Sequence, residues 1–265
     1  MKRYILLVCL IVATSSQAQN DTIFFWKNNV MIHKQSIKTA DLDSITFRRP
    51  IVNMPSVTIC NQIWTSQNLN VSTYSDGTPI PQVTDQTQWA NLTTGAWCYY
   101  NNDPANGAVY GKLYNWYAVM GIYDEASAAN PALRKKLAPT GWHIPTDAEW
   151  SNLINCLDPN AYGGYTTPNV AGGKMKSTET LQAGTGLWQD PNAAATNESG
   201  FTGLPAGYRS SGVPFSYIGG SGYWWSSSEG YTTDAWSRYL SYYSGTAYSY
   251  SSNKRNGLSV RCLRD

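Results

Sequence analysis

The chain has 265 residues, with 19 basic and 17 acidic residues and only 14% charged residues against 13% aromatic ones. This length suits one large domain with or without a small appendage. The near balance of charge excludes the strongly basic surface that binds phosphate backbones, so we expect no nucleic-acid partner.

The first residues have the pattern of a secretory leader. Lys2 and Arg3 precede an apolar run at residues 4–13, and Ser16, Gln17 and Ala18 follow, with small residues at 16 and 18 as in a cleavage site. We therefore expect residues 1–18 to be a signal peptide and the mature protein to be secreted or held at the cell surface. The apolar run is too short for a membrane span, and no later segment is long enough, so we predict no membrane span. Removing Lys2 and Arg3 from the 19 basic residues leaves 17 against 17 acidic ones, a formal net charge of zero.

Residues 19–50 form a predicted short β-rich segment. Two apolar runs, 23–26 and 30–33, lie on either side of the polar residues 27–29, which is typical of a hairpin. Residues 41–47 could add one more strand. The Arg48-Arg49-Pro50 sequence breaks the pattern, so we place the main domain at residues 51–265.

The first half of the main domain alternates short strands with short helices. We expect an opening strand from residue 57, a helix at 84–92 with Thr84 as its cap, and a strand at 97–100. The aromatic run 110–119 has no helix breaker after Gly111, so we predict a second helix there with Leu113, Trp116 and Tyr117 facing inward.

The clearest helix signal lies at residues 146–157. Thr146 and Glu149 have the spacing of a capping box, in which each side chain bonds to the backbone N–H of the other residue. Apolar residues recur every three or four positions after it and predict one buried stripe. These residues are Trp150, Leu153, Ile154 and Leu157.

Four cysteines remain after the leader, an even number that is typical of disulfides in an oxidising compartment. Four cysteines allow three pairings, and we favour Cys98 with Cys262 and Cys60 with Cys156. Only His33 and His143 could join them as ligands, so a structural zinc site is not expected.

Seven sequence segments, taken in order along residues 57–265, resemble the FISUMP (major paralogous domain) family of secreted bacterial proteins. The segments are IWTSQNL, GAWCYYNNDPANG, YGKLYNWYAV, GWHIPTDAEW, ATNESGFTGLPAGYR, YWWSSSE and GLSVRCLRD. The resemblance implies an α+β fold like that of C-type lectins and formylglycine-generating enzymes. Such a fold has twisted antiparallel sheets, two flanking helices and long loops.

The sequence lacks the residues that carry out catalysis and metal binding in proteins with those related folds. Formylglycine-generating enzymes use a cysteine pair shortly before their terminal segment, whereas the chain has no cysteine between Cys156 and Cys262. The metal-binding E-P-N or Q-P-D and W-N-D motifs of calcium-dependent lectins are also missing. No nucleophile elbow, phosphate loop or H-E-x-x-H motif occurs, and His143 fits a structural role better than that of a general base. We therefore predict no catalytic residues, no cofactor, no metal and no enzyme activity.

The last quarter of the chain holds the candidate binding surface. Tyrosines and tryptophans alternate there with Ser and Gly, a composition that resembles antibody paratopes, and such rings also stack on sugars. The hairpin around Ser244 and Gly245 carries most of the candidates. We predict ligand contacts from Tyr231, Tyr242, Tyr243, Tyr248, Tyr250 and Asn253.

The favoured function is a secreted or cell-surface module that binds an extracellular glycan or protein through this Tyr/Trp-rich face. A purely structural reading, in which the tyrosines only cover an extracellular β surface, fits the composition equally well. Two other hypotheses remain: an enzyme of the formylglycine-generating superfamily with altered chemistry, and a structural adhesin component in which residues 21–47 anchor or assemble the protein.

Overall fold

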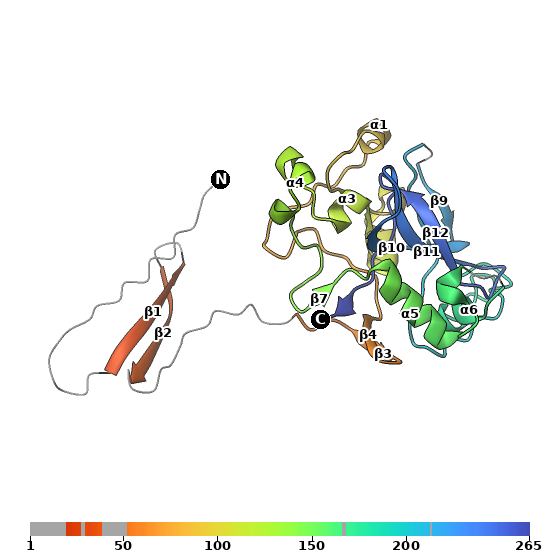
Figure 1. Ribbon diagram of the computed structural model, residues 1–265, viewed down its shortest axis with the longest axis horizontal. Helices are drawn as coiled ribbons and strands as arrows, with labels where there is room; N and C mark the ends of the chain where they lie inside the picture. Colours follow the sequence, from red (N-terminus) through yellow and green to blue (C-terminus); the bar gives the residue numbers. More distant parts are fainter. Residues whose placement is uncertain (1–19, 28–29, 39–51, 166–167, 213) are drawn as a thin grey trace. The chain divides into compact units, whose positions relative to one another are not determined.

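Figure 1 shows the computed structural model of the 265-residue chain, which describes residues 20–27, 30–38, 52–165, 168–212 and 214–265. The chain divides into two compact units, residues 1–49 and 50–265. The expected signal peptide and the possible strand at 41–47 lie outside the described residues. No helix among the described residues has both the length and the apolar character to cross a membrane.

The first unit contains one antiparallel hairpin. Strand β1 (Asn20–Lys27) pairs with β2 (Val30–Lys38) from Asn20 opposite Lys38 to Lys27 opposite Val30. The two predicted strands are therefore confirmed, and both are longer than the apolar runs that indicated them.

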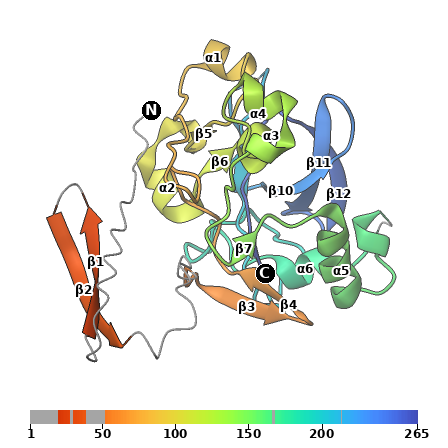
Figure 2. The same cartoon turned by 60° about the vertical axis from the view of Figure 1, so that its left-hand side comes forward.

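The second unit holds a mixed five-stranded sheet in the order β12-β11-β10-β8-β9, in which β8 and β10 run parallel and the other neighbours antiparallel. The strands are β8 (Ala206–Tyr208), β9 (Ser216–Ile218), β10 (Ser221–Glu229), β11 (Asp234–Ser241) and β12 (Tyr248–Asn253). Figure 2 shows β10, β11 and β12 together, with the green helix α5 and the turquoise helix α6 beside them.

Two smaller sheets complete this unit. A four-stranded sheet has the order β3-β4-β13-β7, and β5 pairs with β6. Their strands are β3 (Ser56–Ile59), β4 (Gln62–Thr65), β5 (Trp97–Cys98), β6 (Leu113–Tyr114), β7 (Trp142–His143) and β13 (Leu263–Arg264). Together with the helices they confirm the predicted α+β fold.

Only one of the described helices is longer than two turns. The helices are α1 (Gln86–Ala90), α2 (Pro104–Tyr110), α3 (Trp116–Val119), α4 (Glu125–Ala129), α5 (Asp147–Leu157) and α6 (Ala171–Met175). Long loops join them, so much of the backbone must satisfy its polar groups outside regular structure.

Helix α5 confirms the capping box. Thr146 accepts from the backbone N–H of Glu149, and the Glu149 carboxylate accepts from the backbone N–H of Thr146. Trp150, Leu153 and Ile154 are buried as predicted, in a cluster that includes the strand residues Trp64, Trp224 and Leu240, and Leu157 packs against it partly buried. The helix thus packs against the five-stranded sheet through the predicted stripe.

The predicted helix at 110–119 is wrong. Helix α2 ends at Tyr110, Gly111 takes a φ of 77° that helices do not allow, and β6 follows at once. Asn115 then caps the four-residue helix α3 by accepting from the N–H of Ala118. Leu113 and Trp116 are buried as expected, whereas Tyr117 is only half-buried.

Two other boundaries also move. Helix α1 starts after Asp85, whose carboxylate accepts from the N–H of Gln88, so Asp85 rather than Thr84 is the cap. The strand predicted at 97–100 is confirmed only for Trp97 and Cys98, because a short 3-10 turn begins at Tyr100.

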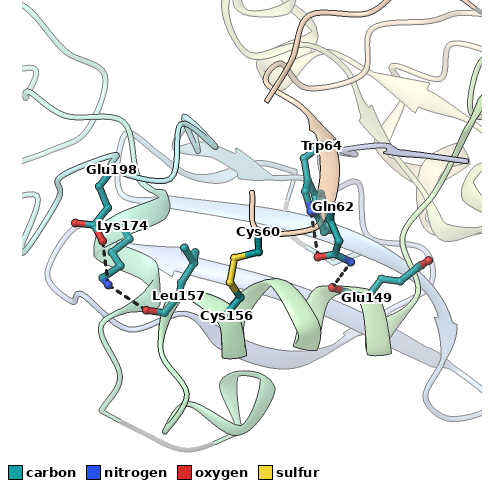
Figure 3. Close-up of a disulfide and its surroundings, with 8 residues drawn as sticks. All are labelled: Cys60, Gln62, Trp64, Glu149, Cys156, Leu157, Lys174 and Glu198. Carbon is teal, nitrogen blue, oxygen red and sulfur yellow. Dashed lines mark hydrogen bonds and ion pairs between the residues drawn. A yellow bond between two sulfur atoms is a disulfide. The ribbon is translucent and has the colours of Figure 1, made fainter. Parts of the chain in front are cut away.

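One predicted disulfide is confirmed and the other is wrong. Cys60 bonds to Cys156 and joins the β3–β4 turn to α5 (Figure 3). Cys98 and Cys262 are both free and buried. They pack in different hydrophobic clusters, Cys98 beside Trp89 and Cys262 in the cluster of Trp142 and Trp225, where each acts as a small apolar side chain.

Three buried cations hold the loops together. Arg261 donates to the backbone carbonyls of Thr65, Phe201 and Thr202 and to the side chain of Asn68, over distances of 2.6–2.9 Å. Arg209 donates to the carbonyls of residues 83–85, and Lys176 donates to those of Ala193, Ser241 and Ser244. None of the three belongs to an ion pair among the described residues. Carbonyl groups therefore take the place of carboxylates as their acceptors.

We expect Arg261→Met to lower the free energy of unfolding by about 3 kcal/mol or more, because four buried acceptors lose a charged donor. Urea denaturation followed by circular dichroism measures the effect. Arg264→Met is the matched control, since Arg264 is exposed three residues further on, and it should change stability by less than about 0.5 kcal/mol. Equal effects of the two substitutions would contradict this role for Arg261.

The free cysteines give a second prediction. Burial raises the pKa of both the Cys98 and Cys262 thiols to about 12, so neither forms an appreciable thiolate at pH 8. Iodoacetamide should leave both thiols unmodified in the native protein and alkylate both after denaturation without reductant, as read by peptide mass spectrometry. A peptide pair joined through Cys98 and Cys262 would contradict the structure.

Candidate functional site

A row of five tyrosines crosses the five-stranded sheet. Each strand contributes one ring, and we call these residues the tyrosine row. In spatial order they are Tyr248 of β12, Tyr239 of β11, Tyr223 of β10, Tyr208 of β8 and Tyr217 beside it on β9.

Neighbouring rings of the row are in contact along its whole length. Ring centroids lie 5.2 Å apart between Tyr248 and Tyr239, 4.8 Å between Tyr239 and Tyr223, 5.1 Å between Tyr223 and Tyr208, and 6.0 Å between Tyr208 and Tyr217. The Tyr239 and Tyr223 rings are stacked with 21° between their planes. Each of these rings covers one flat side of the other, and Tyr248 and Tyr208 flank the pair on its two remaining sides, so neither ring offers a free face for a sugar to stack on.

Strand register places the row on one side of the sheet. Tyr223 lies opposite Tyr239, and Tyr239 lies opposite Tyr248, so the three side chains point the same way. Trp224 and Leu240 alternate with them and face the cluster that contains α5. The row therefore lies on the side of the sheet opposite α5.

Part of this side is closed by the core and part is open. Trp225 and Ala235, which follow the row along β10 and β11, are fully buried, and Tyr208 and Tyr223 pack against their cluster. Tyr217 at one end of the row is 61% exposed, and Tyr243 beside the other end is 62% exposed. The row is thus a ridge whose inner rings are anchored, whose Tyr217 end is open to solvent, and whose other end ring, Tyr248, is half-buried.

The three central rings of the row are electrically neutral. Burial, with added repulsion from neighbouring tyrosines, raises the pKa of Tyr208 and Tyr223, and burial also raises that of Tyr239 to about 12. These phenols therefore keep their protons at physiological pH and can donate hydrogen bonds. The Tyr239 and Tyr243 hydroxyls are 3.3 Å apart, and the Tyr248 hydroxyl lies 3.1 Å from that of Ser244.

The six residues predicted to contact ligand fall in three places. Tyr243, Tyr248 and Tyr250 lie on or beside the row. Tyr242 packs partly buried against the cluster that contains α5, with its ring edge-on to Tyr243 at 5.2 Å. Tyr231 and Asn253 lie at the opposite end of the β11–β12 pair, where the Asn253 side chain accepts from the N–H of Arg255 in a turn.

The central members of the row escaped the sequence reasoning. Alternation along a strand shows which residues of that strand point to the same side of the sheet as Tyr223 or Tyr239. It does not show which strands lie next to each other. The parallel contact between β8 and β10, at Gly207 opposite Gly222, brings Tyr208 into the row, and no local pattern in the sequence predicts that contact.

A second candidate site is a polar groove of about 800 Å³. It lies along α5, next to the β3–β4 turn and the terminal strand β13. Its lining residues, which define the polar groove, are Asn61, Gln62, Ile63, His143, Glu149, Asn152, Asn155, Leu263, Arg264 and Asp265.

His143 joins two acids at one end of the polar groove. Its Nδ1 is 2.8 Å from the carboxylate of Asp265, and its Nε2 is 3.0 Å from that of Glu149. Burial opposes ionisation of Glu149, but bonds from the Thr146 backbone, the Thr146 hydroxyl and His143 outweigh it and lower the pKa of the carboxyl. Glu149 is therefore held as an ionised acceptor, a poor general acid.

The remaining chemistry of the described residues is limited. No group of three or more His, Cys, Asp and Glu side chains among them could hold a metal ion. Sequence reasoning identified His143 and Glu149 but missed Asp265, whose contact with His143 depends on the pairing of β13 with β7.

The capping box yields a pH-dependent prediction. Because the folded state lowers the pKa of Glu149, its ionisation stabilises the protein above the ordinary pKa of 4.5 and this contribution is lost as the pH falls through the lower folded value. We expect Glu149→Gln to destabilise the protein by about 0.5–1 kcal/mol at pH 7. The difference from wild type should shrink below pH 4.5 in urea titrations. Glu125→Gln, at the exposed start of α4, is the control, and a pH-independent difference for Glu149→Gln would contradict the assignment.

Comparison with known proteins places the chain in one family. The family model described as the Fibrobacter succinogenes major domain (Fib_succ_major) matches residues 57–264. No curated protein and no solved structure matches the chain. The match covers nearly the whole second unit, including both candidate sites except for Asp265. The chain therefore belongs to the Fibrobacter succinogenes major domain family, which is the FISUMP family that its motifs resemble.

Proposed function

We propose that this protein is a non-enzymatic binding module that acts outside the cytoplasm and holds an uncharged glycan chain on the tyrosine row. The observation that carries the proposal is the unbroken contact of five tyrosine rings across five strands. The Cys60–Cys156 disulfide supports a location in an oxidising compartment.

The tyrosine row is suited to binding because its order is already fixed. A tyrosine has few rotamers to lose, and the contacts between neighbouring rings restrict them further before any ligand arrives. The phenol hydroxyls and the serines beside them supply neutral donors and acceptors. A surface of this kind matches a ligand that is rich in hydroxyl and ether oxygens and carries no charge.

The geometry also indicates how a glycan would lie. Strands are about 4.8 Å apart, so five of them present a ridge about 19 Å long. The covered inner rings can offer only their edges and hydroxyls, whereas the exposed end ring of Tyr217 has room for stacking. We therefore expect an extended chain that runs across the strands, with stacking at the Tyr217 end and hydrogen bonds along the rest of the row.

The enzyme hypothesis has weaker support. It needs a titratable group ready to exchange a proton, and the acids around His143 are already engaged with it while Glu149 is held ionised. A protein ligand for the tyrosine row is the other outcome of the test below.

The proposal predicts binding of neutral polysaccharides that depends on the row. Isothermal titration with cello-, xylo- and manno-oligosaccharides of increasing length should show affinity that rises until the chain spans the ridge and then levels off. The double substitution Tyr217→Ala/Tyr248→Ala should weaken binding of the long chains about tenfold or more, since two contacts of roughly 1 kcal/mol each are lost.

Tyr162→Ala is the matched control for this experiment. Tyr162 is a 68% exposed tyrosine outside the row, so its removal should leave the affinity unchanged. Equal losses in both variants would assign binding to general aromatic surface. No binding of any glycan by the wild-type protein would overturn the glycan proposal and leave a protein ligand as the alternative.

A further inference from the structure

The polar groove has two walls that come from distant parts of the chain. Glu149, Asn152 and Asn155 are spaced by three residues on α5, so they follow one side of that helix. Asn61, Gln62 and Ile63 form the facing wall at the β3–β4 turn. The groove therefore opens between a helix and a hairpin.

Two links hold these walls at a fixed separation. The Cys60–Cys156 disulfide joins them covalently, and the Gln62 side chain donates to the backbone carbonyl of Glu149 over 3.2 Å (Figure 3). The Trp64 indole in turn donates to the Gln62 side-chain oxygen over 3.4 Å and fixes its orientation. The groove is thus pre-organised, which reduces the entropy that a ligand must lose on binding.

Several groups in the groove already have partners. His143 binds both carboxylates, and the Asn155 side chain accepts from the N–H of Gly163 over 2.6 Å. Within the described part of the chain, three polar lining side chains have no hydrogen-bond or ion-pair partner. They are Asn61, Asn152 and Arg264.

The free groups define the chemistry of a ligand. Each amide offers both a donor and an acceptor, and the guanidinium offers several donors in one plane. Adjacent hydroxyls of a sugar can satisfy such groups in pairs. A volume of about 800 Å³ is also within the range of small-molecule sites and admits a ligand of a few sugar units.

We propose that the polar groove is a second ligand site, separate from the tyrosine row, that binds a short polyhydroxylated ligand through Asn61, Asn152 and Arg264. The disulfide links the two walls that carry Asn61 and Asn152. This inference does not depend on the proposed function, because the row lies on the side of the five-stranded sheet opposite α5.

Nuclear magnetic resonance titration of the full chain tests the proposal. Two probes distinguish the ligand sources: cellotetraose is neutral, and tetragalacturonate adds carboxylates that could pair with Arg264. At least one probe should shift the side-chain amide signals of Asn61 and Asn152 in a saturable manner. Asn152→Ala should weaken that binding about tenfold, the effect of losing roughly 1.4 kcal/mol.

Three controls make the result specific. Asn160→Ala removes an exposed amide just beyond α5, outside the groove, and should leave the affinity unchanged. Arg264→Gln should weaken binding of tetragalacturonate, because its carboxylates lose a charged partner. Lys136→Gln removes an exposed charge outside the groove and should leave that binding unchanged. Tyr217→Ala/Tyr248→Ala should leave groove binding intact even if it abolishes binding at the row.

Reduction of the disulfide provides a separate readout. Dithiothreitol should weaken probe binding at the groove while circular dichroism stays unchanged, since the two walls are then free to separate. Failure of both probes to shift the amide signals would overturn the proposal. Shifts that persist unchanged in Asn152→Ala and Arg264→Gln would overturn it as well.

Discussion

The second unit depends on one kind of interaction, a buried cation that donates to several backbone carbonyls at once. Loops between short helices and strands leave carbonyl groups without ladder partners, and an unpaired buried carbonyl is costly. Arg261 donates to three carbonyls, one at the end of strand β4 and two in the distant loop at Phe201 and Thr202, and it also donates to Asn68, which itself accepts from the Trp224 indole. Arg261 in the last segment of the chain is thereby linked through Asn68 to Trp224 of β10. Without such donors, these buried carbonyls would be left unpaired, which would weaken the loops that carry them.

The buried cations also hold irregular segments of backbone next to the tyrosine row. Lys176 donates to the carbonyls of Ser241 and Ser244, which lie on either side of Tyr242 and Tyr243. The turn beside the tyrosine row is therefore held by hydrogen bonds from a fully buried side chain, that of Lys176. The rings in contact need a fixed backbone, because a shift of about 1 Å would separate stacked faces. The ordered row is a consequence of this anchoring as much as of the tyrosines themselves.

Local signals in the sequence predicted what depends on neighbouring residues. The capping box at Thr146 and Glu149, the buried stripe of α5 and the N-terminal hairpin all follow from spacing within a few positions. The helix predicted at 110–119 fails because Gly111 and Asn115 act as a stop and a new cap within an aromatic run whose periodicity resembles a helix. Cys98 and Cys262 escape pairing because tertiary packing places them in different clusters. The row and the groove combine distant segments, so neither could be predicted whole.

The residues that hold the fold together differ from those that face solvent at the two candidate sites. Arg261, Arg209 and Lys176 make the contacts that hold the loops, and they are buried where a ligand cannot reach them. The exposed rings of Tyr217 in the row and of Tyr243 beside it carry almost none of those contacts, and neither do the free amides of the groove, such as that of Asn152. Changes at these exposed positions should therefore alter ligand preference at little cost to folding. A fold built in this way can present different surfaces on the same anchored loops.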